Sequence, residues 1–298
     1  IRDDRVSRGL GDVYKRQELD FYSRPILDER QKKLWELLIC QSPIGINDAT
    51  DSLYRYSEFT NSQQVNSIWL GRAIEKAIAQ APEPPEKIRF FRRQMNNMIA
   101  KACAELAIPI ALSRRTYLLN QWLEQRMEEV YPTYPGYQPG TNSSGQYMNS
   151  APQPLPDALI GEKWTFVSLE AGAFTEMSEW DIDFGEVFPL TMMNLAPNSL
   201  IPGLIIYSSR AQPIAAWISG LELAFVQFNH GSPARLLLNT GGNDCWILAN
   251  LTNPSMIAEA KTFSEAKSKA KEVHFLAVQS DPESESFAGF WLLQEINI

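Results

Sequence analysis

The first half of the chain alternates between strand-like and helix-like patterns of apolar and polar positions. Three runs rich in strand formers come first: ELDFYSRPI (18–26), LWELLICQ (34–41) and LYRYSEFT (53–60). A helix, a strand, a helix, a short strand and a helix are predicted after them, at 62–80, 87–93, 94–107, 108–112 and 113–130. This order predicts a mixed α/β domain with a ribonuclease H-like fold.

The second half of the chain is also mixed. Its apolar runs predict strands at 163–169, 203–208, 234–240, 245–251, 274–280 and 287–296. Helical periodicity predicts helices at 212–223 and 255–271. The stretch TGGND (240–244) predicts a hairpin turn between two of the strands. We therefore expect a second mixed α/β domain.

Two segments fit neither pattern. Residues 1–17 have no periodicity and resemble a translated sequencing adaptor, so we interpret them as a non-native leader. Residues 132–156 are uncharged and rich in Pro, Gly, Ser, Asn and Tyr, which is typical of a linker. The predicted organisation is a leader (1–17), a ribonuclease H-like domain (18–131), a linker (132–156) and a C-terminal α/β domain (157–298).

Composition narrows the classes of protein. The chain has 298 residues, of which 44% are hydrophobic, and no apolar run approaches the roughly 18 residues of a membrane span, so a soluble two-domain protein is expected. The three cysteines, Cys40, Cys103 and Cys245, are far apart and form no metal or redox motif. With His230 and His274 as its two histidines, the chain is a poor match for a His-rich metal site or a Ser-His-Asp triad. We predict no cofactor and no metal.

Charge divides unevenly between the halves. Residues 18–150 hold 15 basic and 15 acidic residues, whereas residues 151–298 hold 7 basic and 17 acidic residues, a net charge of −10. A polyanion is therefore expected to meet the first half. The stretch 87–115 alone contains seven basic residues and one acid.

The basic stretch offers two candidate contacts for RNA. In KIRFFRR, basic and aromatic residues are interleaved, and a strand would place Lys87, Arg89, Phe91 and Arg93 on one face. Such a face suits single-stranded RNA through phosphate contacts and base stacking. The alternative is a central strand that buries both Phe90 and Phe91, which we prefer for the two rings.

The second candidate is the stretch Ser113-Arg114-Arg115, which we expect at the start of the helix 113–130, with Ser113 as its cap. Positive charge there opposes the helix dipole, and a bound phosphate would relieve it. Ion pairs with Asp28 or Glu29 are the alternative. A similar strand, Ser-x-Arg turn and helix recur at 205–218, with a Trp seven residues after each Arg.

A ribonuclease H-like order also raises a nuclease hypothesis, in which Asp20 on the first strand and Glu75 on the first helix would hold metal ions. Two-metal chemistry needs several converging carboxylates, but the strand 87–93 and the helix start at 114–115 present arginines instead. We prefer an ion pair between Asp20 and Arg24, four residues further along the same strand face.

Several ordered segments together resemble the Tab/Atab family of RNA-binding translation activators from cyanobacteria, algae and chloroplasts. The resemblance extends from Glu18 almost to the end of the chain, and the segments that carry it include ELDFYSRPILDERQKKLWELLICQ, IRFFRRQMNNMIAKAC, LSRRTYLLNQWL, IPGLIIYSSRAQPIAAWISGLEL and FAGFWLL. The family's C-terminal motif corresponds to Trp291, Leu292 and Leu293, with Gln294 in place of a further leucine. A strand with this motif is expected in the core.

The resemblance implies a non-enzymatic protein that promotes translation of photosystem I reaction-centre mRNA (psaB), in cyanobacterial cytoplasm or chloroplast stroma. Its expected partners are an A/U-rich mRNA leader and the ribosome or translation factors. The candidate RNA-binding residues are Lys87, Arg89, Arg92, Arg93, Arg114, Arg115 and Arg24. Two alternatives stay open: a metal-dependent nuclease, and an assembly factor that binds a basic partner through the acidic C-terminal domain.

Overall fold

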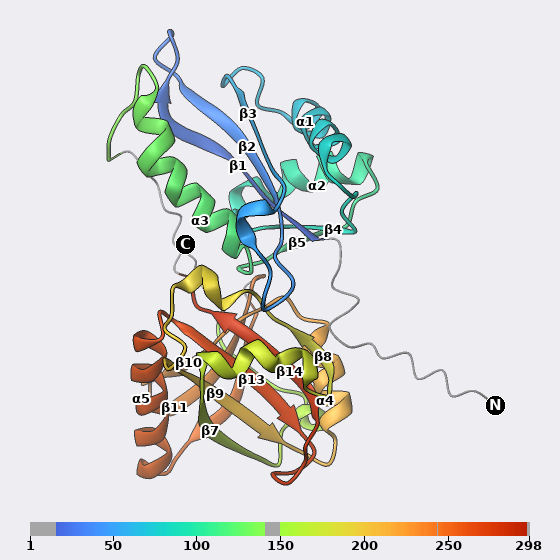
Figure 1. Cartoon of the computed structure of the whole chain (residues 1–298), viewed down its shortest axis with the longest axis vertical. Helices are drawn as coiled ribbons and strands as arrows, with labels where there is room; N and C mark the ends of the chain where they lie inside the picture. Colours follow the sequence, from blue (N-terminus) through green and yellow to red (C-terminus); the bar gives the residue numbers. More distant parts are fainter. Residues whose placement is uncertain (1–15, 141–149, 243, 297–298) are drawn as a thin grey trace, which may run out of the picture. The chain divides into compact units, whose positions relative to one another are not determined.

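The computed structural model describes residues 16–140, 150–242 and 244–296, and the chain divides into two compact units. The N-terminal unit is built from Tyr14–Pro43 and Ala49–Tyr147, and the C-terminal unit mainly from Met148–Asn297. Both units combine sheets with helices (Figure 1), so the mixed α/β class is confirmed. Residues 1–15 of the predicted leader and 141–149 of the predicted linker lie outside the described part.

The N-terminal unit contains a five-stranded mixed sheet with the strand order β3-β2-β1-β4-β5. Its strands are β1 (Arg16–Leu27), β2 (Lys33–Gln41), β3 (Arg55–Thr60), β4 (Lys87–Phe90) and β5 (Ile110–Leu112). Strands β1 to β3 are antiparallel neighbours, whereas β4 and β5 run parallel to β1. The order of strands and helices along the chain is the predicted one, and the assignment to the ribonuclease H-like fold stays a prediction.

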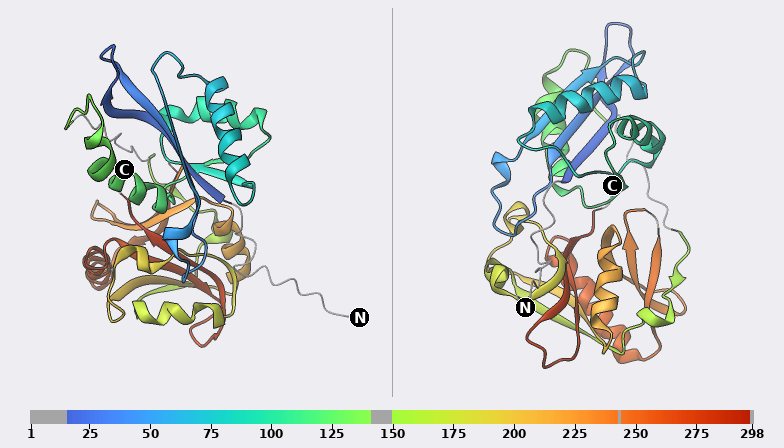
Figure 2. Two further views of the ribbon diagram at one scale, coloured as in Figure 1. Left: turned by 45° about the horizontal axis from the view of Figure 1, so that its top comes forward. Right: turned by 90° about the vertical axis from the view of Figure 1, so that its right-hand side faces the viewer.

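Three helices cover this sheet: α1 (Ser67–Gln80), α2 (Asn96–Glu105) and α3 (Tyr117–Gln125). Helices α1 and α2 lie on one face and α3 on the other (Figures 1 and 2). Helix α1 begins where the Asn66 side chain accepts the Trp69 N–H, and it buries Leu70, Ala73, Ile74 and Ala77 at helical spacing. A π turn (Arg126–Val130) and a 3₁₀ turn (Tyr131–Thr133) continue α3.

Three predicted boundaries in this unit are wrong. Helix α1 begins at Ser67 and not at residue 62, because the Asn66 side chain caps it. Strand β4 ends at Phe90, so Arg92 and Arg93 follow the strand instead of belonging to it. Helix α3 begins at Tyr117, and Ser113 does not cap it, because the Ser113 hydroxyl accepts the Arg115 N–H in a tight turn before the helix. Arg114 and Arg115 therefore precede α3.

The start of the predicted linker packs against the end of β1. Tyr137 forms an isolated bridge with Ile26, and the Leu27 N–H donates to the carbonyl of Gly136 at 2.9 Å. Gly136 has a φ of 82°, and a Cβ atom there would lie 2.4 Å from the Leu27 carbonyl oxygen. This close approach explains the glycine, and it places residues up to about 138 beside the N-terminal sheet.

The C-terminal unit contains two sheets. The larger sheet has the order β7-β9-β13-β14-β8 and the smaller has the order β10-β11-β12-β6. The bounds are β6 (Gln153–Pro154), β7 (Lys163–Glu170), β8 (Ile182–Glu186), β9 (Leu200–Tyr207), α4 (Ala211–Ser219), β10 (Leu223–Asn229), β11 (Ala234–Thr240), β12 (Cys245–Leu251), α5 (Pro254–Lys269), β13 (Val273–Gln279) and β14 (Phe287–Gln294). The predicted hairpin pairing of β11 with β12 is confirmed, although Asn243 lies outside the described residues.

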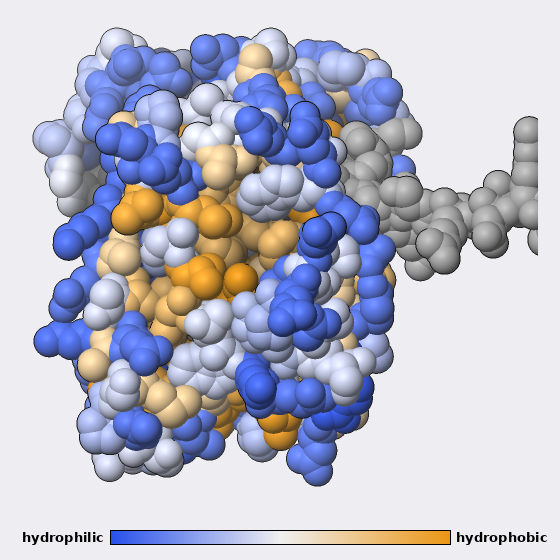
Figure 3. All heavy atoms as spheres, turned by 60° about the horizontal axis from the view of Figure 1, so that its bottom comes forward, coloured by the Kyte–Doolittle hydropathy of each residue, from blue (hydrophilic) through white to orange (hydrophobic). Residues whose placement is uncertain are grey.

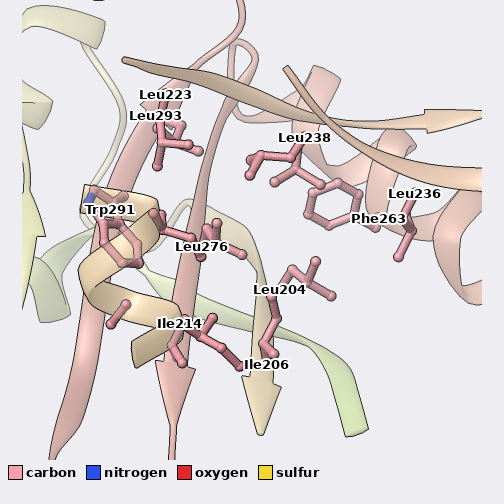
Figure 4. Close-up of a cluster of buried hydrophobic side chains, with 14 of the residues drawn as sticks. Leu204, Ile206, Ile214, Leu223, Leu236, Leu238, Phe263, Leu276, Trp291 and Leu293 are labelled. Atoms are coloured by element: carbon pink, nitrogen blue, oxygen red, sulfur yellow. The ribbon is translucent and has the colours of Figure 1, made fainter. Parts of the chain in front are cut away.

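The main core of this unit combines residues from both sheets and from helices α4 and α5. Figure 4 shows Leu204, Leu276 and Leu293 from the larger sheet, Leu236 and Leu238 from the smaller sheet, and side chains from both helices. Several residues packed against this core are partly exposed, among them Trp164, Phe166, Trp217, Trp246 and Leu248. Figure 3 shows one face of the molecule where apolar residues gather among hydrophilic ones.

Two further predictions in this unit need correction. The helix predicted at 212–223 ends at Ser219, and Leu223 begins strand β10, because the apolar run LAFVQFN is compatible with either period. Strands β6, β8 and β10 were not predicted.

In the described ranges no helix is long and apolar enough to cross a membrane.

Candidate nucleic-acid interface

The parallel strands β1, β4 and β5 bring the two parts of the basic stretch to one edge of the N-terminal sheet. Phe90 pairs with Leu112, and the Ser113 N–H donates to the Phe90 carbonyl at 2.8 Å. The segments 91–93 and 113–115 therefore leave the sheet from neighbouring strand ends. The carboxyl ends of strands in an open α/β sheet are the usual place for a ligand.

Burial divides the candidate residues into two groups. The buried group is Arg24, Arg89, Arg114 and Arg115, with exposed fractions of 2%, 3%, 4% and 3%. Lys87 and Arg92 are partly exposed, and Arg93 is exposed. The arginines therefore form no single exposed patch. Three of the candidate residues have access to solvent. Arg92 and Arg93 follow the carboxyl end of β4, and Lys87 lies at its amino end.

The rings of Phe90 and Phe91, for which the sequence left both base stacking and burial open, are buried. Phe90 is 1% exposed on β4, which lies between β1 and β5 and not at an edge, and Phe91, the residue after β4, is 2% exposed. The preferred prediction for these two rings is confirmed. RNA bases would have to stack on other aromatic side chains.

Asp20 forms the centre of a buried ion-pair network. Its two oxygens accept from Arg24 Nη1 at 2.9 Å and from Arg92 Nε at 2.7 Å. Burial opposes ionisation of Asp20, but the two guanidiniums outweigh it and hold the pKa of the carboxyl below its usual value. The predicted Asp20–Arg24 ion pair is confirmed, and Arg92 shares the same carboxylate.

Glu36 on β2 extends this network to the end of α3. The Glu36 carboxylate accepts from Arg24 Nε at 3.0 Å, from the Tyr131 hydroxyl at 2.5 Å and from Arg126. Sequence reasoning missed Glu36, Arg126 and Tyr131 as parts of this network. The available signal was a single acid within the apolar strand LWELLICQ, because a buried charge needs partners.

Glu18 supplies the cap that α3 lacks locally. It lies two residues before Asp20 on β1, and its Oε2 accepts the Leu119 N–H at 2.8 Å in the first turn of the helix. The Cys40 thiol donates to the same oxygen at 3.8 Å. Burial raises the pKa of Glu18 from 4.5 to about 7, although the Leu119 hydrogen bond and the Arg89 charge favour ionisation.

The carboxylates do not have the arrangement that two-metal hydrolysis needs. Both oxygens of Asp20 are engaged by guanidiniums, and Glu75 is exposed on α1. Within the described ranges, no group of three or more His, Cys, Asp or Glu side chains could hold a metal ion. The site is instead built from arginine side chains and aromatic rings.

The repeated Ser-x-Arg turn has the same local geometry in both units. Ser113 and Ser208 are buried, and each hydroxyl accepts the N–H of the arginine two residues later at 3.1 Å. The C-terminal motif residues Trp291, Leu292 and Leu293 are 3%, 0% and 0% exposed on β14, so the expected core position is confirmed.

The fold defines a two-unit α/β protein. The carboxyl ends of β1, β4 and β5 give it a cationic candidate interface. Family models for the N-terminal and C-terminal domains of the RNA-binding protein Tab2/Atab2 match residues 17–126 and 142–294. The chain is 41% identical to the chloroplastic protein TAB2 homolog of Arabidopsis thaliana, over 96% of this chain and 76% of the relative. It is 37% identical to the chloroplastic TAB2 homolog of Zea mays, over 94% and 71% respectively. The chain belongs to the Tab2/Atab2 family of RNA-binding proteins.

Proposed function

We propose that the protein promotes translation of photosystem I reaction-centre mRNA (psaB) by binding its A/U-rich leader, without catalytic chemistry of its own. It acts in chloroplast stroma or cyanobacterial cytoplasm, with the ribosome or translation factors as further partners. Membership of an RNA-binding family is the observation that carries this proposal. The neutral N-terminal half, beside a C-terminal half of net charge −10, supports RNA binding through the N-terminal unit.

The solvent-accessible basic residues bind the phosphates in this proposal. Arg93 is exposed, and Lys87 and Arg92 are partly exposed. The buried Arg24, Arg89, Arg114 and Arg115 act indirectly, by holding the sheet edge in shape and by adding positive potential. This division changes which variants are informative, because neutralising a buried arginine also destabilises the fold.

The double variant Lys87→Gln with Arg93→Gln is expected to bind an A/U-rich leader RNA more weakly than wild type. For a single strand, neutralising one phosphate-binding side chain makes the slope of log K against log salt shallower by about 0.7, so the double variant should be shallower by about 1.4. Filter binding across a salt series measures both quantities. Lys261→Gln with Lys269→Gln, two exposed positions on α5, is the charge-matched control. A slope equal to that of wild type would count against the proposal.

The nuclease alternative has a direct test. Incubating end-labelled RNA with the protein and Mg²⁺ or Mn²⁺ is expected to leave the RNA intact. Metal-dependent cleavage that disappears in Asp20→Asn would replace the proposed function with two-metal hydrolysis.

A second candidate function is docking of a basic protein on the C-terminal unit. The observation that favours it is a groove of about 510 Å³ between β7 and α5, lined by Phe166, Val167, Pro202 and Glu259 among others, in the acidic half of the chain. A partner captured after RNase treatment, and no longer captured when residues 157–298 are deleted, would support it.

A further inference from the structure

Three partly exposed aromatic side chains of the N-terminal unit belong to one continuous row of rings. They are Tyr22 on β1, Trp35 on β2 and Trp69 in the first turn of α1. Tyr22 and Trp35 have ring centroids 5.6 Å apart. The buried Phe21 links Trp35 to Trp69, with 5.5 Å between its centroid and each of theirs. Aromatic contacts at these distances orient the rings relative to one another.

Arg92 extends the row at the carboxyl end of β4. Its guanidinium carbon lies 4.2 Å from the centroid of the Tyr22 ring and 4.8 Å from that of Phe91. The Arg92 Nε donates to Asp20 at 2.7 Å, so the planar group is held in place before any ligand arrives. A fixed guanidinium beside aromatic rings suits both base stacking and phosphate binding.

Positive charge flanks the row on both sides. Exposed Arg93 follows Arg92, and exposed Lys33 lies two residues before Trp35 on β2. In the β1–β2 turn, one oxygen of Asp28 accepts the backbone N–H groups of Arg30 and Lys32 at 2.9 Å each, so this carboxylate stabilises the turn.

The pairing of β1 with β4 ends at Leu19, which lies opposite Phe90. Tyr22 therefore lies on the part of β1 that extends beyond the end of β4.

We propose that Tyr22, Trp35 and Trp69 form a base-stacking surface for unpaired RNA nucleotides, with Arg92, Arg93 and Lys33 contacting the phosphates. The inference rests on the proposed RNA binding and assigns the base-contacting residues, a role the buried Phe90 and Phe91 do not take. Base stacking combined with a basic groove is the general way in which proteins hold single strands. Hydrogen bonds to base edges are not required, so the surface accepts any unpaired base.

The double variant Tyr22→Leu with Trp35→Leu removes two flat faces and keeps apolar volume. It is expected to bind a 12-nucleotide uridine-rich RNA about 5-fold to 150-fold more weakly for each base that can no longer stack. Its salt slope stays at the wild-type value because no charge is removed. An abasic oligonucleotide of equal length, which keeps the phosphates, should bind wild type and variant alike. Trp217→Leu, at a partly exposed Trp on α4, is the control.

The outcomes separate the two proposals. If wild type binds the uridine-rich RNA with a steep salt slope and the double variant binds it equally well, the stacking surface is wrong and the proposed function stands. If wild type binds neither oligonucleotide, the proposed function itself fails. Equal binding of wild type to duplex and single-stranded RNA also overturns the stacking surface.

A second measurement avoids substitutions altogether. Wild-type protein is cross-linked to an oligonucleotide that carries 5-iodouridine, and the modified peptides are mapped by mass spectrometry. Cross-links at Tyr22, Trp35 or Trp69 are expected, because 5-iodouracil reacts with stacked aromatic side chains. Cross-links confined to other aromatic residues overturn the proposal even if the double variant fails to fold.

Discussion

Replacing Glu36 by alanine is expected to lower the free energy of unfolding of the N-terminal unit by about 3–5 kcal/mol. The Glu36 side chain is fully buried and pairs with Arg24 and Arg126. Without Glu36, both guanidiniums keep their charge and lose a carboxylate partner, and the Tyr131 hydroxyl loses its acceptor. Breaking one side of a buried ion pair leaves an uncompensated charge, which costs more than the intact pair contributes.

Urea unfolding followed by circular dichroism measures this effect. Glu75→Ala is the matched control, because Glu75 is an exposed glutamate of the same unit, and its removal should change stability by no more than about 0.5 kcal/mol. A destabilisation below about 1 kcal/mol in Glu36→Ala would mean that Arg24 and Arg126 find other acceptors or water.

The second large effect concerns Glu18 and pH. The pKa of Glu18 is raised by burial from 4.5 to about 7, so the folded protein holds a proton that the unfolded chain has released. Between these two values the free energy of unfolding falls as pH rises, by roughly 3 kcal/mol in total, because each pKa unit corresponds to about 1.4 kcal/mol. Below pH 4.5 and above pH 7 the contribution of Glu18 is constant.

The measurement is the difference in unfolding free energy between wild type and Glu18→Gln at each pH. A glutamine can still accept the Leu119 N–H, and it does not titrate. The comparison is needed because buried His274 acts in the opposite direction: burial and the nearby Lys267 hold the pKa of His274 well below 6.5, so its contribution is lost as pH falls. A difference that does not vary between pH 4.5 and 7 would contradict the prediction.

Local patterns predicted much of the N-terminal unit. Alternation along β1 placed Asp20 and Arg24 on one face, and their ion pair is present. The two adjacent phenylalanines in KIRFFRR favoured a central strand, and both are buried. The helix start at Ser113 was wrong because its hydroxyl forms a local turn, while the α3 cap comes from Glu18, 101 residues away in sequence.

The site itself was only partly predictable. The sequence marked Arg92 and Arg93 as basic residues beside aromatic ones, but it could not separate them from the buried Arg89, Arg114 and Arg115. The ring contacts of Tyr22 with Trp35 and Arg92 depend on strand register and on where β4 ends. Neither is determined by short-range periodicity.

The long-range ion pairs of β1 and β2 have a consequence for the protein during its own synthesis. Asp20 needs Arg92, which is 72 residues later, and Glu36 needs Tyr131, which is 95 residues later. While the ribosome has made only the β1–β3 meander, Asp20 and Glu36 share Arg24 as a partner, whereas Arg92, Arg126 and Tyr131 have not yet been made. The complete buried network can therefore form only after the segment that follows α3 has left the exit tunnel.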